Sequence, residues 1–170
     1  ADHAIANTDA FHQALAAAEA QASKGHLVTF GITPNAPETG YGYIRRGDSL
    51  DASTGAYAVS QFVEKPALAT AEKYLESGEY YWNSGMFLFK ASVYLKELQS
   101  FEPAVYEASN AAFKASKSDL DFLRIDEEAF SQSPNIAIDY AVMERTENAV
   151  VVAMDAAWSD LGSWSSLWEH

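Results

Sequence analysis

Opposite charges stand side by side at Glu64 and Lys65, at the end of an apolar run and directly before Pro66. A carboxylate accepts hydrogen bonds from sugar hydroxyls, and an ammonium beside it suits a phosphate as a point charge. Side chains alternate along a strand, but a turn at Pro66 can bring both groups toward one cavity. The alternative is an ion pair at the end of a strand, which contributes little to stability.

Two further positions carry groups suited to a hydroxylated ligand. Gly42 lies in the run ETGYGYI, and without a Cβ it lets a ligand approach the backbone closely. Asn83 lies in the run WNSGM and offers both a donor and an acceptor to a hydroxyl. The plainer interpretations are a turn glycine at Gly42 and, at Asn83, an Asx turn that leads into a buried strand.

Two carboxylates at opposite ends of the chain are candidate metal ligands. Asp2 is the second residue, and Asp160 lies in the run WSDLGSW, between two tryptophans. Two carboxylates can hold one Mg²⁺ while phosphate oxygens and water fill its other positions. The plainer interpretations are a frayed terminus for Asp2 and a turn or helix-cap residue for Asp160.

Several other kinds of chemistry are excluded. The chain has no cysteine, which excludes disulfides, thiolate zinc sites and cysteine nucleophiles. Its four histidines are scattered without the spacing of metal ligands. It contains no Gly-x-Ser-x-Gly elbow, no Walker loop and no Gly-rich dinucleotide fingerprint.

The chain is strongly acidic. Its 170 residues include 24 Asp and Glu against 11 Lys and Arg, which gives a net charge of −13. This balance argues against binding to DNA, RNA or an anionic membrane surface, because these need clustered positive charge. No apolar run approaches the roughly 18 residues that span a bilayer, and no signal peptide is visible. We therefore expect a cytoplasmic protein with no nucleic-acid or membrane partner.

One compact α/β domain is expected to position these residues. The length suits one domain, 48% of the residues are hydrophobic, and no linker divides the chain. Ligands of open α/β sheets bind beyond the strand ends, so the candidate loops are residues 33–42, 65–66, 82–85 and 158–162. The patterns predict strands at residues 26–32, 41–46, 56–64, 86–89 and 149–154, a turn region at 47–55, and helices at 8–24, 70–77, 91–97, 103–117, 120–131, 139–145 and 163–168.

The order of the motifs is more specific than any one of them. The chain begins with ADH and then carries ETGYGYI, FVEKP, YYWNSGMFLF, IDYAVMER and WSDLGSW. In this order they resemble the bacterial mannose-1-phosphate guanylyltransferases, also called GDP-mannose pyrophosphorylases. The resemblance covers the whole chain and is weakest across residues 110–135. YYWNSGMFLF together with IDYAVMER is specific, whereas FVEKP is shared by sugar-nucleotide pyrophosphorylases in general.

The resemblance implies a nucleotidyltransferase fold, with a mixed sheet in a Rossmann-like, three-layer α/β arrangement. It implies that mannose 1-phosphate attacks the α-phosphate of GTP and that pyrophosphate leaves, with catalysis by positioning and charge neutralisation. On this resemblance Asp2 and Asp160 would hold Mg²⁺ between the sugar phosphate and the nucleotide. Lys65 would neutralise the sugar phosphate. The product would be GDP-mannose, which typically feeds polysaccharide biosynthesis.

The resemblance also implies a sugar pocket. Glu64 would accept hydrogen bonds from mannose hydroxyls, and Asn83 with the backbone at Gly42 would line the pocket. Asp139 would help to order it, although a position at the cap of a helix is enough to explain this residue.

One motif of the family is missing. The family's domain begins with a Gly-rich loop close to GGxGxRLWPLS that cradles the nucleotide phosphates, and nothing in this chain matches it. The resemblance therefore implies that residues 1–170 are the C-terminal, sugar-phosphate-binding part of a single nucleotidyltransferase domain. The fold would be incomplete and the isolated chain inactive. An exposed sheet edge would then favour low stability or self-association into a homo-oligomer.

Two other functions fit the same residues. One is a pyrophosphorylase for another sugar nucleotide. The other is a non-catalytic carbohydrate-binding or assembly domain that uses aromatic platforms such as Trp82. This second alternative predicts that ligand binding ignores Mg²⁺ and survives Asp160→Ala.

Overall fold

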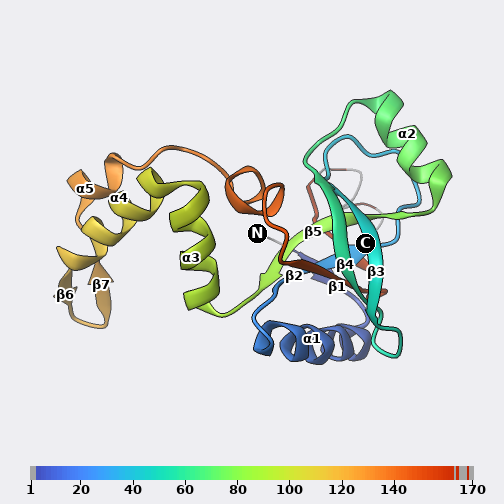
Figure 1. The fold of residues 1–170 in the computed structure, drawn as a ribbon, viewed down its shortest axis with the longest axis horizontal. Helices are drawn as coiled ribbons and strands as arrows, with labels where there is room; N and C mark the ends of the chain where they lie inside the picture. The colour runs from blue at the N-terminus through green and yellow to red at the C-terminus, as the bar shows by residue number, and fades with distance from the viewer. Residues whose placement is uncertain (1–2, 163, 165–167, 169–170) are drawn as a thin grey trace. The chain divides into compact units, whose positions relative to one another are not determined.

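The structure is a computed structural model that describes residues 3–162, 164 and 168. The chain divides into two compact units, shown in Figure 1: one combines Ala1–Lys90 with Glu147–His170, and the other is Ala91–Thr146. The absence of a linker predicts one compact unit. The structure has two because the chain leaves the first unit after Lys90 and returns to it at Glu147.

Five strands of the first unit close into a barrel of mixed strand direction. In the order β2-β5-β3-β4-β8, only β2 and β8 run parallel to each other. The mixed sheet predicted from the sequence is therefore present, and the predicted strands at the positions of β2, β4 and β8 are confirmed. The five strands are β2 (Leu27–Ile32), β5 (Tyr80–Leu88), β3 (Tyr43–Asp51), β4 (Ala56–Val63) and β8 (Ala149–Ala153).

The helix α1 (Thr8–Ser23) packs on this barrel with a face made largely of alanine. Asn7 caps its start, because the side-chain oxygen accepts the backbone N–H three residues on at 3.1 Å. Ala18 lies in one buried cluster with Val150 and Val152 of β8. Small side chains let the helix lie close to the sheet, and burial of each valine contributes roughly 1.5–3 kcal/mol.

The strand β3 is longer than the sequence pattern predicts. The pattern ends this strand at Arg46 and predicts a turn over residues 47–55, but the strand continues to Asp51 and only residues 52–55 form the turn. The added part is mostly exposed and polar, so it has no alternation of apolar residues. Backbone pairing with β4 holds it in the sheet.

A single strand, β5, replaces the loop predicted at residues 82–85 and the strand predicted at 86–89. Its buried part is residues 81–84, whereas residues 86–88 are only half-buried. The sequence predicts the reverse because asparagine, serine and glycine are typical turn residues. In the structure, Gly85 adopts a φ of 73° inside the strand, where the ladder with β2 shifts register.

The connection between β4 and β5 holds the helix α2 (Leu68–Ser77). It confirms the helix predicted at residues 70–77 and begins two residues earlier. Gly78 ends it with a φ of 66°, a left-handed conformation that glycine adopts without strain.

A short antiparallel ladder joins β1 (Ala4–Ile5) to β9 (Trp158–Ser159). Ala4 lies opposite Ser159, and Ile5 lies opposite Trp158. The ladder therefore brings the beginning of the described chain beside the residue that precedes Asp160. Most of the helix predicted at residues 163–168 lies outside the described residues.

The second unit consists mainly of the helices α3 (Ala91–Phe101), α4 (Pro103–Lys114) and α5 (Glu127–Ser131). A π-helical turn, η1 (Asp139–Met143), replaces the short α-helix predicted at residues 139–145. Asp139 is its first residue, and the preceding isoleucine occupies the cap position that the sequence assigns to the aspartate. No helix in the described part of the chain is long and apolar enough to cross a membrane.

A β-hairpin takes the place of most of the helix predicted at residues 120–131. β6 (Lys117–Asp119) pairs antiparallel with β7 (Phe122–Arg124), and only α5 is helical in this stretch. Leu120 turns the chain with a φ of 53°. All residues of both strands are exposed, so the hairpin leaves no apolar alternation in the sequence.

Candidate functional site

Three of the predicted ligand residues meet where β3, β4 and β5 pair side by side. Tyr43, the first residue of β3, lies opposite Val63 on β4 and Trp82 on β5. One step further along each antiparallel strand brings Gly42 beside Glu64 and Asn83. The Asn83 backbone N–H donates to the Gly42 carbonyl oxygen at 2.8 Å, which fixes this juxtaposition.

The close approach of two side chains favours glycine at position 42. A Cβ there would overlap Glu64 Oε2 and would lie 3.2 Å from Asn83 Cβ. The two polar side chains therefore crowd over the Gly42 backbone, an approach that a residue without a Cβ permits. The turn-glycine interpretation does not account for these contacts.

Glu64 and Lys65 form the ion pair that the sequence offers as an alternative. Lys65 Nζ lies 2.8 Å from Glu64 Oε1. The Glu64 side chain is 10% exposed and the Lys65 side chain 59% exposed, so the lysine end remains in water and the pair adds little stability. Lys65 has a φ of 48°, and such left-handed backbone in a non-glycine residue costs roughly 1–2 kcal/mol and gathers at functional sites.

Asn83 is 8% exposed and is held by hydrogen bonds at its side-chain oxygen. Thr29 Oγ1 donates to Asn83 Oδ1 at 3.0 Å, and the Gly85 backbone N–H donates to the same atom at 3.2 Å. The second bond is the Asx contact predicted as the plainer interpretation. Asn83 therefore has both an Asx contact and a place beside Gly42.

Asp160 accepts two hydrogen bonds at one oxygen. The Tyr41 hydroxyl donates to Asp160 Oδ1 at 2.9 Å, and the Gly162 backbone N–H donates to it at 3.1 Å. The turn role predicted for Asp160 is thus present, together with a side-chain partner 119 residues away in sequence. Burial, followed by the hydrogen bond to Asp160 and the charges of Asp160 and Glu38, raises the pKa of Tyr41. The phenol therefore remains a donor.

Tyr41 connects the aspartate to the rest of the site through its ring. Its centroid lies 5.1 Å from that of Trp82 and 5.7 Å from that of Trp158, edge-on in both cases. The loop at residues 33–42, predicted from its prolines and glycines, places this tyrosine just before the start of β3. The sequence gives no role to Tyr41 or Thr29. Its one local signal is that Tyr41 stands between two glycines, just before a strand.

The proposed metal ligands are only partly described. Asp2 lies outside the described residues. Within the described part of the chain, no group of three histidine, aspartate or glutamate side chains could hold a metal ion, and no donor hydrogen-bonds to Asp160 Oδ2. A single carboxylate such as that of Asp160 suits Mg²⁺, because this ion keeps several waters and takes further ligands from phosphates.

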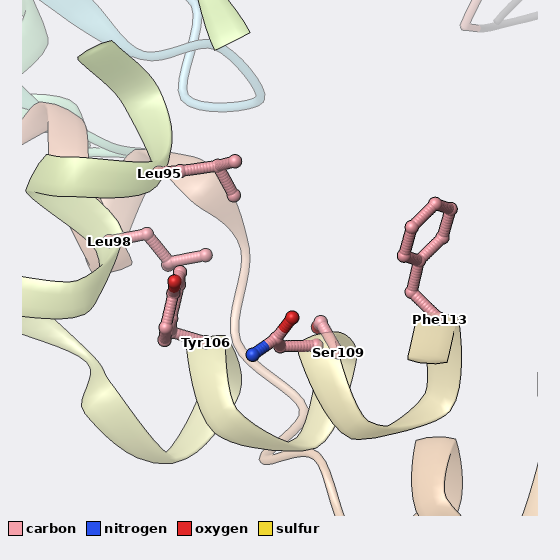
Figure 2. A pocket seen from close by; sticks show the side chains of 6 residues that line it. Leu95, Leu98, Tyr106, Ser109 and Phe113 are labelled. Carbon is pink, nitrogen blue, oxygen red and sulfur yellow. The ribbon is translucent and has the colours of Figure 1, made fainter. Parts of the chain in front are cut away.

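The predicted ligand residues do not line the larger of two hollows in the structure. A hollow of about 200 Å³ borders the candidate site and is lined by residues that include Thr33, Trp82, Asp155 and Trp158. A larger, mainly apolar hollow of about 360 Å³ lies in the second unit between α3 and α4, where Figure 2 shows the side chains of its lining. The larger hollow contains none of the predicted ligand residues; it is lined by Leu95, Leu98, Tyr106, Ser109, Asn110 and Phe113.

Comparison with known proteins gives the family. The family model described as nucleotidyl transferase matches residues 1–170. The chain is 61% identical, over 99% of its length, to mannose-1-phosphate guanylyltransferase ManC of Salmonella typhimurium. It is 58% identical over 99% of its length to mannose-1-phosphate guanylyltransferase of Escherichia coli, and 60% identical over 98% to xanthan biosynthesis protein XanB of Xanthomonas campestris. The chain spans about 36% of the length of the first two and 35% of the third.

Solved structures confirm the fold. A structure titled mannose-6-phosphate isomerase from Helicobacter pylori matches with a TM-score of 0.84 and 35% identity, covering 94% of this chain and 61% of that one. A structure titled mannose-1-phosphate geranyltransferase from Thermus thermophilus matches with a TM-score of 0.83 and 35% identity, covering 98% and 46%. The chain therefore has the mixed α/β nucleotidyltransferase-like fold that its motifs predict.

Proposed function

The chain belongs to the nucleotidyl transferase family, and we propose that it supplies the sugar-phosphate and metal ligands of a mannose-1-phosphate guanylyltransferase. In that reaction a phosphate oxygen of mannose 1-phosphate bonds to the α-phosphorus of GTP, and the bond to the β-phosphate oxygen breaks. The products are GDP-mannose and pyrophosphate. Residues 1–170 would form the C-terminal, sugar-phosphate-binding part of one nucleotidyltransferase domain. Relatives named for this activity, which are 58% and 61% identical to the chain, support the proposal.

One observation carries the proposal: Glu64 and Asn83 crowd over the bare backbone of Gly42. The largely buried carboxylate of Glu64, when ionised, accepts hydrogen bonds and donates none. The amide group of Asn83 can donate them. Together they match a sugar hydroxyl, which both donates and accepts. The absence of a Cβ at residue 42 lets both of these side chains lie close to the main chain.

Lys65 would neutralise the phosphate of mannose 1-phosphate. Its side chain is mostly exposed, so a phosphate can approach the ammonium from solvent. In a chain of net charge −13 a local cation is needed to receive a sugar phosphate.

Nucleotidyltransferases generally use a divalent metal, and we propose Mg²⁺, held by Asp160 and Asp2. When bound, the ion would neutralise phosphate charge and help to orient the two phosphates. Tyr41 would hold Asp160 through Oδ1, so that Oδ2 is presented to the ion. A cytoplasmic location, the use of GTP and a role in polysaccharide biosynthesis belong to the same proposal, and the name of the xanthan relative supports the last of these.

Calorimetric titration of the chain with mannose 1-phosphate, with and without Mg²⁺, tests this function. We expect Mg²⁺-dependent binding that Glu64→Gln weakens roughly 10- to 100-fold, because a charged hydrogen-bond acceptor is lost. Glu79→Gln is the matched control, since Glu79 forms an exposed ion pair with Arg45 away from Gly42. Binding that ignores Mg²⁺ and survives Asp160→Ala would instead support a carbohydrate-binding domain. Preference for glucose 1-phosphate would indicate another sugar nucleotide.

A further inference from the structure

We propose that Thr29 and a bulge in β5 orient the Asn83 carboxamide so that its N–H end, and not its oxygen, faces Gly42 and the proposed sugar. Thr29 would then be a positioning residue that determines specificity at the sugar pocket. This inference rests on the proposed function, because it assumes that Asn83 faces the sugar. Its evidence is the geometry of β2 and β5.

The bulge is visible in the register of the two strands. Thr29 lies opposite Phe87, whereas Gly31 lies opposite Asn83. Two steps along β2 thus correspond to four steps along β5. The additional residues include Gly85, whose left-handed backbone turns its N–H toward the Asn83 side chain. Bulges of this kind redirect side chains beside functional sites.

The bulge fixes which end of the amide is oxygen. A backbone N–H can only donate, so the Asn83 atom 3.2 Å from the Gly85 nitrogen must be an acceptor. The Thr29 hydroxyl donates to the same oxygen at 3.0 Å, and this is shorter than its 3.3 Å distance to the Met86 carbonyl oxygen. A carboxamide oxygen has two lone pairs, and both are therefore occupied.

The other end of the amide faces the glycine. Asn83 Nδ2 lies 3.6 Å from the point that a Cβ of residue 42 would occupy, and Glu64 Oε2 borders the same point. A donor and an acceptor therefore converge over Gly42. This pair fits a hydroxyl that accepts from Asn83 and donates to Glu64, which is the chemistry of a sugar rather than of a carboxylate or a phosphate.

Thr29 is fully buried in the middle of β2, at a position where the apolar pattern of the strand would suit valine. Valine has nearly the same shape but would leave Asn83 Oδ1 with one donor and a methyl group against it. The amide would then lose part of what holds its orientation. Serine keeps the hydroxyl and loses only a methyl group.

The test compares Thr29→Val with Thr29→Ser in the whole chain. Two readouts are used: the affinity for mannose 1-phosphate by calorimetry, and the ¹³Cγ chemical shift of Asn83 by NMR, which responds to hydrogen bonds at Oδ1. We expect Thr29→Val to weaken binding roughly tenfold and to move the Cγ resonance. Thr29→Ser should bind within about twofold of the unchanged chain and keep its Cγ resonance.

Equal losses in the valine and serine variants would overturn the inference, because they would show a packing effect. Unchanged affinity in Thr29→Val would also overturn it. If the unchanged chain binds no mannose 1-phosphate, the proposed function fails, and the Asn83 resonance decides the inference: an unmoved resonance in Thr29→Val overturns it. Thr29→Ala replaces the valine variant if that variant does not fold.

Discussion

Two regions of the molecule differ in the side chains that line them and in the elements that supply those side chains. One is the site around Gly42 in the first unit. The other is the apolar hollow between α3 and α4 in the second unit, lined by residues that include Leu95 and Phe113 and called the groove below. At Gly42, polar side chains from neighbouring parts of the barrel lie close together, and Asn83 Oδ1 and Glu64 Oε1 have partners. The groove is lined mainly by apolar side chains from two helices, and two of these, Leu95 and Phe113, are exposed. From this difference we expect a ligand to bind at the convergent polar groups and not in the larger apolar hollow.

The two regions also depend differently on chain topology. The Gly42 site exists because β3 lies between β4 and β5, so a change in register would separate its residues. The groove needs only two adjacent helices. Substitutions at Gly42 and its neighbours should therefore change ligand binding strongly, and substitutions in the groove should not.

The largest effect is expected from Gly42→Ala. Its Cβ would overlap Glu64 Oε2 and displace the carboxylate from the site, so mannose 1-phosphate affinity should fall more than about 100-fold. Gly40→Ala is the matched control, because a Cβ there would meet no described atom within 4 Å. Calorimetry checks both variants. Equal affinities in the two would show that the close approach at Gly42 has no role in binding.

A smaller effect is expected from Tyr41→Phe. Losing the phenol donor on Asp160 Oδ1 should loosen the carboxylate and weaken metal binding by roughly tenfold, as for other residues that orient metal ligands. Titration with Mn²⁺ followed by EPR measures this directly. Tyr43→Phe is the control, since the Tyr43 hydroxyl donates to the Glu38 carbonyl instead. A loss of metal affinity in both variants, or in neither, would contradict the role given to Tyr41.

The free energy of unfolding of the first unit should depend on pH through Tyr43. Burial raises the pKa of Tyr43 above its ordinary value, so the folded chain keeps a proton that the unfolded chain loses above pH about 10. The free energy of unfolding is therefore independent of this group at lower pH and falls as the pH rises past about 10. Urea unfolding at pH 9 and pH 11 should show a smaller fall for Tyr43→Phe. An equal fall in both proteins would assign the effect to other tyrosines.

The smallest effect is expected from Phe113→Ser in the groove. Phe113 is 61% exposed, so its loss should change the free energy of unfolding by no more than about 0.5 kcal/mol. Mannose 1-phosphate affinity should change less than about twofold. A tenfold loss of affinity would mean that the second unit takes part in binding and would remove the contrast between the regions.

The sequence predicts the parts of the fold that local patterns determine. The helix α1, the strands β2, β4 and β8, and the loop at residues 33–42 have clear caps, apolar runs or prolines. The sequence pattern predicts a loop and a shorter strand in place of β5, because WNSG is typical of a turn. Only pairing with β2 and β3 holds those residues in a strand, and such pairing is not visible in local sequence.

The candidate site was predicted in part for the same reason. Gly42, Glu64 and Asn83 were selected by chemistry and by resemblance, and the structure brings them together. Thr29 lies in an apolar strand and gives no local signal, so its contact with Asn83 appears only when β2 and β5 pair. The left-handed backbone of Lys65 likewise follows from the turn after β4 and not from its residue type. The roles of these residues in binding stay predictions.

NMR titration of the ¹⁵N-labelled chain with mannose 1-phosphate and Mg²⁺ tests the central claim most directly, because it reports both regions at once. The account predicts that the amide resonances of Gly42, Glu64 and Asn83 shift in proportion to bound ligand, while those of Leu98 and Phe113 stay in place. Shifts confined to Leu98, Phe113 and the rest of the groove, or no shifts at saturating ligand, would contradict it.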